Sequence, residues 1–125
     1  MNYTTSEQSK KLLELGLDPN TADLTLNLYA EKETVIMKPY RECKEFFNVS
    51  EIPSFLIPCW SIELIDLMPY EIKEDGDTYR LLVTHKLVQY PRLTTLWPSL
   101  HNSHADSTFE AAYNMMIWLL ENKYL

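Results

Sequence analysis

Three polar residues near the C-terminal end of the chain, His101, His104 and Asp106, have side chains that could bind a metal ion. Imidazole nitrogens and carboxylate oxygens are common ligands of zinc and similar ions. One hypothesis is therefore a metal-dependent hydrolase that uses this group. The spacing His-x-x-His is also common by chance, and no glutamate accompanies it as in the helical metalloprotease motif. The alternative is a solvated polar loop that leads into the last helix.

The other residue types that carry catalysis form no recognisable motif. Cys43 and Cys59 are too far apart for a CxxC site, and Cys59 is most simply a small core residue. The carboxylates between Glu71 and Asp77 are best explained as a solvated turn. Two glycines in the whole chain argue against a phosphate-binding loop. We therefore expect no cofactor and favour a non-enzymatic function.

Aromatic residues are abundant, with three Trp and eight Tyr in the chain. Trp and Tyr provide large contact areas and are enriched in protein interfaces. Met115, Trp118 and Tyr124 are predicted to lie on the back of the last helix, where they would contact a protein partner or a second copy. The alternative is that a second layer of the same fold covers them.

The charge of the chain restricts the partners that it can bind. The net charge is −7, from 18 acidic and 11 basic residues. A protein that binds a nucleic-acid backbone needs Lys and Arg, so direct nucleic-acid binding is not expected. An acidic inhibitor that mimics nucleic acid and blocks a basic partner remains a third hypothesis.

The length of 125 residues fits a single domain, 1–125, with a core of its own. Residues 1–11 are polar and lack the apolar run of a signal peptide, and no window is apolar enough to cross a membrane. We therefore expect a cytoplasmic protein with no membrane contact and with reduced cysteines.

Two helices are predicted at the ends of the chain. The last one, residues 107–122, begins with Ser107 as its N-cap and Glu110 three residues later, which is the pattern of a capping box. The first helix is predicted to begin after Thr4 or Thr5, either of which can serve as its N-cap, and to end at about Leu15. Gly16 follows at the position where a left-handed residue commonly ends a helix.

Strands are predicted between these helices. Residues 24–30 alternate between apolar and polar, and residues 34–37 form a second strand that pairs with them. Asp75-Gly76 between two strand-like runs, 70–73 and 78–88, is a strong hairpin signal. The predicted fold is α+β, with a small, mostly antiparallel sheet packed by the N-terminal and C-terminal helices as a single pair of layers.

Two segments, residues 6–23 and residues 111–122, resemble small uncharacterised proteins of gut Bacteroidales that are often carried on prophages or other mobile elements. Pro58-Cys59-Trp60-Ser61 before a short Leu/Ile helix fits the same pattern. The resemblance covers about a third of the chain, and it implies an accessory protein of a bacterial mobile element. It implies no catalytic residues.

Overall fold

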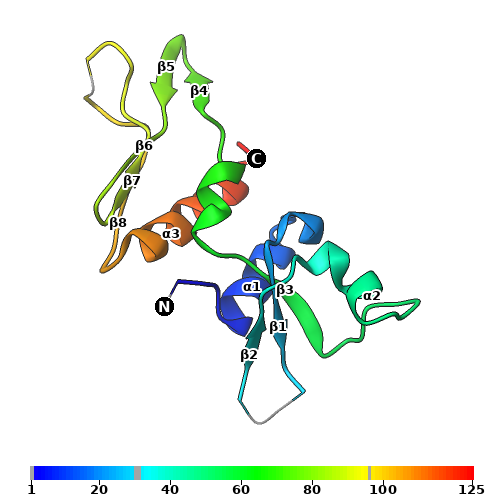
Figure 1. Ribbon diagram of the computed structural model, residues 1–125. Helices are drawn as coiled ribbons and strands as arrows, with labels where there is room; N and C mark the ends of the chain where they lie inside the picture. The colour runs from blue at the N-terminus through cyan, green and yellow to red at the C-terminus, as the bar shows by residue number, and fades with distance from the viewer. Residues whose placement is uncertain (1, 30–31, 96) are drawn as a thin grey trace. The chain divides into compact units, whose positions relative to one another are not determined.

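The computed structural model describes residues 2–29, 32–95 and 97–125, and these residues form two compact units, Met1–Glu63 and Leu64–Leu125 (Figure 1). The α+β fold class is confirmed, with helices and strands in both units. The strands form three small antiparallel sheets instead of the one sheet that was expected. The expectation of a single domain, 1–125, stays a prediction.

The first unit contains one three-stranded sheet and several short helices. Its elements are α1 (Ser6–Glu14), the 3-10 helix η1 (Pro19–Thr21), β1 (Leu24–Asn27), β2 (Thr34–Ile36), the 3-10 helix η2 (Tyr40–Glu42), α2 (Cys43–Phe46) and β3 (Leu56–Cys59). The strand order is β2-β1-β3, with both pairings antiparallel. The predicted pairing of the first two strands is therefore confirmed.

The two ends of α1 follow from local sequence. The Thr5 hydroxyl accepts a hydrogen bond from the Gln8 backbone N–H, and the Gln8 side chain accepts one from the Thr5 N–H. Of the two predicted caps, Thr5 is the one that forms. Gly16 has a φ of 99°, and the Leu17 N–H reaches back to the Leu12 carbonyl at 3.0 Å. This is the Schellman ending that the glycine predicts.

The central strand β1 is covered on both faces. Leu24 and Leu26 form a core cluster with Cys59, as the alternation predicted. Thr25 was expected to face solvent, but it is fully buried. Its hydroxyl donates to the Lys38 carbonyl at 3.0 Å, so the buried oxygen is satisfied by the chain that follows β2. The predicted end of this strand, Ala30, lies outside the described residues.

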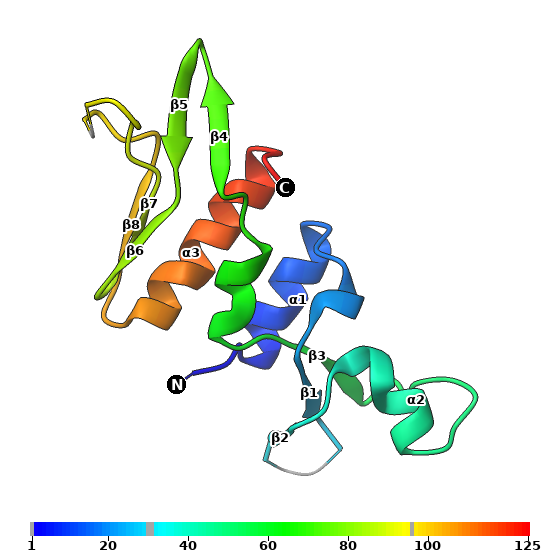
Figure 2. The ribbon, with the colours of Figure 1, turned by 45° about the horizontal axis from the view of Figure 1, so that its top comes forward.

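The second unit contains two sheets and the long C-terminal helix. The 3-10 helix η3 (Ile62–Leu67) includes the boundary between the units, and it is followed by β4 (Glu71–Glu74), β5 (Asp77–Arg80), β6 (Leu82–Thr84), β7 (Leu87–Gln89), β8 (Asn102–His104) and α3 (Thr108–Glu121). The strands pair as β4-β5 and β6-β7-β8. Helix α3 packs along β7 and β8 (Figure 2).

The predicted hairpin forms at Asp75-Gly76. Glu74 pairs with Asp77 across the turn, and both central residues have positive φ, 51° for Asp75 and 82° for Gly76. Positive φ at both central residues is typical of the type I′ turn that Asp-Gly favours. This turn places Glu74 and Asp75 at the tip of the β4–β5 hairpin.

Replacement of Gly76 with alanine is expected to lower the free energy of unfolding by about 1 kcal/mol, because a Cβ is strained at positive φ. No atom lies within 4 Å of the added Cβ, so the effect would come from the backbone alone. Urea denaturation followed by circular dichroism measures it. Gly76→Asn is the matched control, since asparagine tolerates this conformation. Equal losses in both variants would contradict the backbone explanation.

Two of the predictions for the second unit are wrong. The run 78–88 is not one strand, because it turns at His85-Lys86, where Lys86 has a φ of 61°, and continues as β7. The polar segment 101–106 is not a loop throughout, because Asn102–His104 pairs with β7 as an edge strand. Asn102 and His104 lie on the exposed face of this strand and Ser103 on the buried face, where its hydroxyl donates to the Ala111 carbonyl, which explains how a polar sequence can form it.

None of the helices in residues 2–29, 32–95 and 97–125 is long and apolar enough to cross a membrane.

Candidate partner-binding surface

Three aromatic rings of the second unit form a continuous stack, which we call the aromatic stack: His101, Trp118 and Tyr124. The His101 and Trp118 ring centroids are 4.4 Å apart, with an angle of 3° between the planes. The Trp118 and Tyr124 centroids are 5.3 Å apart, at 26°. All three residues are half-buried, so the stack lies at the surface of the unit with part of each side chain exposed.

Trp118 lies on helix α3, and the buried face of this helix fixes its position in the unit. Ser107 caps the helix by accepting from the Glu110 N–H at 3.1 Å, as predicted. The residues of α3 that are buried are Phe109, Ala111, Ala112, Met115, Met116, Leu119 and Leu120. Met115 is 0% exposed, so the prediction that it lines a partner surface is corrected. Its unbranched side chain fills the core instead.

Tyr124 reaches Trp118 because the chain reverses directly after α3. Lys123 adopts a left-handed φ of 60°, and the Tyr124 N–H donates to the Leu119 carbonyl at 2.9 Å. This is a Schellman ending without glycine, and it folds the residue after the turn back over the last helical turns. The reversal therefore places the Tyr124 ring against the Trp118 indole.

The far end of Tyr124 is fixed by the β4–β5 hairpin. Its hydroxyl donates to Oε2 of Glu74 at 2.9 Å. The hydrogen bond to the Glu74 carboxylate, which lies beside the hydroxyl, raises the pKa of Tyr124 above its usual value. The C-terminal tail is thus tied to a hairpin fifty residues earlier in the chain.

His101 stacks on the Trp118 indole with its ring nearly parallel to it. Its carbonyl accepts from the Tyr90 N–H at 3.0 Å, just before β8 begins, so the β7–β8 pairing sets its position. Burial lowers the pKa of His101 below the ordinary value of 6.5. The imidazole is therefore neutral at pH 7, and it stacks on Trp118 as an uncharged ring.

This arrangement limits what the stack can bind. The Trp118 indole already stacks with two rings, His101 and Tyr124, which leaves less of its surface for a ligand ring. What remains for a partner is the exposed part of these three half-buried rings. Such a surface suits contact with the side chains of another protein, since edge-to-face and cation–π contacts use these positions.

The predicted metal ligands are not brought together. His101 stacks on Trp118, whereas His104 and Asp106 are exposed. Successive residues of a strand point to opposite faces, so His104 lies on the face opposite to Ser103, which is buried against α3. Across residues 2–29, 32–95 and 97–125, no three His, Cys, Asp or Glu side chains are placed to hold a metal ion.

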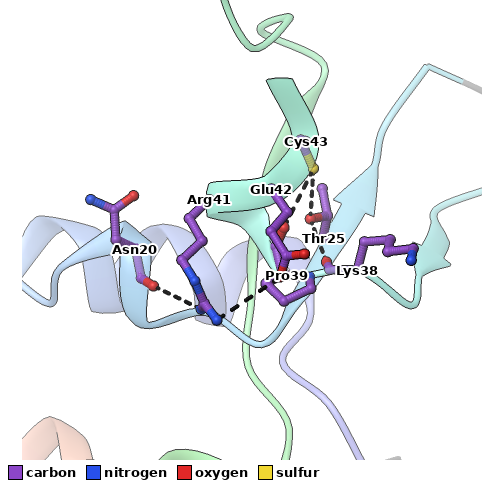
Figure 3. Close-up of polar contacts among 7 residues, drawn as sticks. All are labelled: Asn20, Thr25, Lys38, Pro39, Arg41, Glu42 and Cys43. Carbon is purple, nitrogen blue, oxygen red and sulfur yellow. Dashed lines mark hydrogen bonds and ion pairs between the residues drawn. The ribbon is translucent and has the colours of Figure 1, made fainter. Parts of the chain in front are cut away.

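The two cysteines are buried, and neither is poised as a nucleophile. Cys43 lies beside the Thr25 hydroxyl and the Pro39 carbonyl, neither of which is a general base (Figure 3). Burial raises the pKa of the Cys59 thiol to about 11. A thiol that stays protonated is a poor nucleophile, so Cys59 acts as the core residue that the sequence predicted.

The acidic residues are interleaved with basic ones. Arg80 pairs with Glu71 at 3.1 Å in the β4–β5 hairpin. Arg41 also lies between two acceptors, the Asn20 carbonyl and the Glu42 carboxylate (Figure 3). A mimic of nucleic acid needs an uninterrupted acidic stripe, and these two pairs place basic side chains beside acidic ones. The hypothesis of an acidic inhibitor stays a prediction.

Comparisons of the chain with protein-family models, with curated proteins and with solved structures find no match.

The sequence pointed to Trp118 and Tyr124 but missed two members of the surface. His101 was considered only as a metal ligand, and Glu74 only as part of a solvated turn. The contributions of His101 and Glu74 depend on long-range pairing and carry no local signal.

Proposed function

We propose that this protein is a non-enzymatic binding protein that contacts a protein partner through the aromatic stack. The observation that carries the proposal is the ordered, half-exposed stack of His101, Trp118 and Tyr124. Residues that dominate the binding energy of interfaces are enriched in Trp and Tyr. A stack that is already fixed in the free protein also loses little side-chain entropy when a partner binds.

The proposed setting is the bacterial cytoplasm, where the protein would serve as an accessory protein of a mobile element. The resemblance of residues 6–23 and 111–122 to Bacteroidales proteins supports this setting. The partner would then be a protein of the host cell or of the element. A second copy of the chain is the other occupant that the surface could accept, and the experiment below separates the two.

Replacement of Trp118 with alanine is expected to weaken the partner complex by about 30-fold or more, the loss typical of a central interface aromatic. Tagged wild type captures the partner from a lysate of the source bacterium. The partner is then purified, and its Kd for each variant is measured by calorimetry. Light scattering after size exclusion reports whether the wild type is a dimer that Trp118→Ala dissociates.

Trp97→Ala is the matched control, because Trp97 is 73% exposed and lies outside the stack. It removes an indole of the same size and should leave the Kd unchanged. A complex that tolerates Trp118→Ala as well as Trp97→Ala would overturn the proposal. A wild-type dimer that Trp118→Ala dissociates would assign the surface to self-association in place of a different partner.

A further inference from the structure

We infer that the partner presents an arginine side chain to the Tyr124 end of the aromatic stack, where the guanidinium lies on the Tyr124 ring and pairs with Glu74 and Asp75. This inference deepens the proposed function and rests on it. The inference specifies the chemistry of the partner: the contacting segment is basic and carries an arginine.

The first support is the exposed part of Tyr124, which is half-buried. One face of the ring lies against Trp118, and the hydroxyl is held by Glu74. Among the described residues, Trp118 is the aromatic ring that stacks on Tyr124, and no Lys or Arg of the protein lies over the Tyr124 ring. A guanidinium over the face of a tyrosine within about 6 Å of the ring centre is a favourable cation–π contact.

The second support is the negative charge beside that ring. The Tyr124 hydroxyl uses only Oε2 of Glu74, which leaves the other carboxylate oxygen of Glu74 available. Asp75 is exposed at the hairpin tip, and its charge also acts on Tyr124. Two carboxylates next to an aromatic face are complementary to a cation.

The third support is that this charge is not neutralised by the protein itself. Arg80 pairs with Glu71, and Arg92 pairs with Asp77 at 3.2 Å. In the part of the chain that the structure describes, no Lys or Arg forms an ion pair with Glu74 or Asp75. The hairpin tip therefore offers an acidic site to a partner, while the neighbouring acids are already paired.

Arginine fits this site better than lysine. Its planar guanidinium stacks on an aromatic ring and can bind a carboxylate through two parallel N–H groups, whereas the lysine ammonium is a strongly hydrated point charge. The Tyr124 hydroxyl lies 2.9 Å from the Glu74 carboxylate, so one guanidinium can contact both the ring and the carboxylate.

The test uses the full chain and three capped tripeptides, Gly-Arg-Gly, Gly-Lys-Gly and Gly-citrulline-Gly. Citrulline has nearly the shape of arginine but carries no charge. Amide and indole N–H shifts in NMR spectra follow the titrations. We expect Gly-Arg-Gly to bind about fivefold or more tightly than Gly-citrulline-Gly, the size expected for one charge-assisted contact. The shifts should centre on Asp75, Gly76 and Tyr124.

The decisive variant is the double substitution Glu74→Gln with Asp75→Asn. Glutamine retains an oxygen that accepts from the Tyr124 hydroxyl, and asparagine suits the left-handed φ of position 75, so the stack should persist. Arginine selectivity should be lost. Glu51→Gln removes an exposed carboxylate in the first unit and should change nothing. Equal binding of the arginine and citrulline peptides, or unchanged selectivity in the double variant, would overturn the inference.

The purified partner complex separates failure of this inference from failure of the proposed function. A complex that needs Trp118 but is unaffected by the double substitution would overturn the arginine contact and leave the proposed function in place. A complex that is unaffected by Trp118→Ala would overturn the proposed function. A complex that is weakened by Trp118→Ala and also by the double substitution would support both the proposed function and the arginine contact.

Discussion

Replacement of Trp60 with alanine is expected to lower the free energy of unfolding by about 3 to 5 kcal/mol, the usual range for truncation of a fully buried large aromatic side chain. Trp60 is 0% exposed, and its indole N–H donates to the Thr21 hydroxyl at 3.1 Å. Its backbone N–H donates to the Thr4 hydroxyl at 3.0 Å. The residue therefore joins the N-terminal segment, η1 and the end of β3 within the first unit.

Urea denaturation followed by far-ultraviolet circular dichroism measures this loss without relying on tryptophan fluorescence. Trp60→Phe should lose less, because it retains a ring while giving up the hydrogen bond to Thr21. Trp97→Ala should change the free energy of unfolding by no more than about 0.5 kcal/mol, as is usual for an exposed site. A Trp60→Ala variant as stable as Trp97→Ala would show that Trp60 is not a core residue.

Replacement of Met115 with alanine is expected to lower the free energy of unfolding by about 2 to 5 kcal/mol, because it opens a cavity in a packed core. Met115 lies on the buried face of α3, and Val88 and Tyr90, from β7 and the residue that follows it, are fully buried in the same unit. The same denaturation experiment measures the effect. A loss below about 0.5 kcal/mol would indicate that Met115 is exposed at the surface, as the sequence predicted.

Two variants sharpen this result. Asn114→Ala changes the neighbouring exposed residue of α3 and should have little effect on stability. Met115→Leu keeps most of the side-chain volume and should lose less than about 1.5 kcal/mol. The Met115→Leu protein should also bind the partner as well as the wild type, whereas Trp118→Ala should not. Weaker partner binding by a stable Met115→Leu protein would contradict the separation of core from surface.

Local structure could be predicted from the sequence wherever the determining groups are close in the chain. The Thr5 and Ser107 caps each act on a backbone N–H three residues later, and Gly16 and Gly76 mark left-handed positions. These signals require no tertiary information. The helices and the Asp75-Gly76 hairpin were accordingly predicted close to where they form.

The failures involve residues whose conformation is set from a distance. Lys86 and Lys123 adopt left-handed φ although neither is Gly, Asn or Asp, so the turns they form carried no sequence signal. The strand Asn102–His104 is polar, and its pairing with β7 decides its conformation. Thr25 is buried because the segment that follows β2, which includes Lys38, covers it. The local sequence pattern does not predict any of these long-range contacts.

The candidate surface shows the same division. Trp118 and Tyr124 could be named from the aromatic surplus of the last helix, because both lie within or just beyond it. Met115 was assigned to the wrong face, since an apolar helix gives no clear sign of which side is covered. His101 and Glu74 joined the surface only when the sheet and the hairpin placed them beside the helix end.

The aromatic stack and the Glu74 carboxylate that holds it come from a hairpin, the residue before an edge strand, a helix and a tail, so no short peptide of this chain contains all of them. Glu74, His101, Trp118 and Tyr124 meet only when residues 64–125 are folded. A partner that binds this surface would therefore bind the folded chain and not its unfolded or truncated forms. Its binding free energy would add directly to the stability of the folded state, which makes recognition and folding one linked equilibrium.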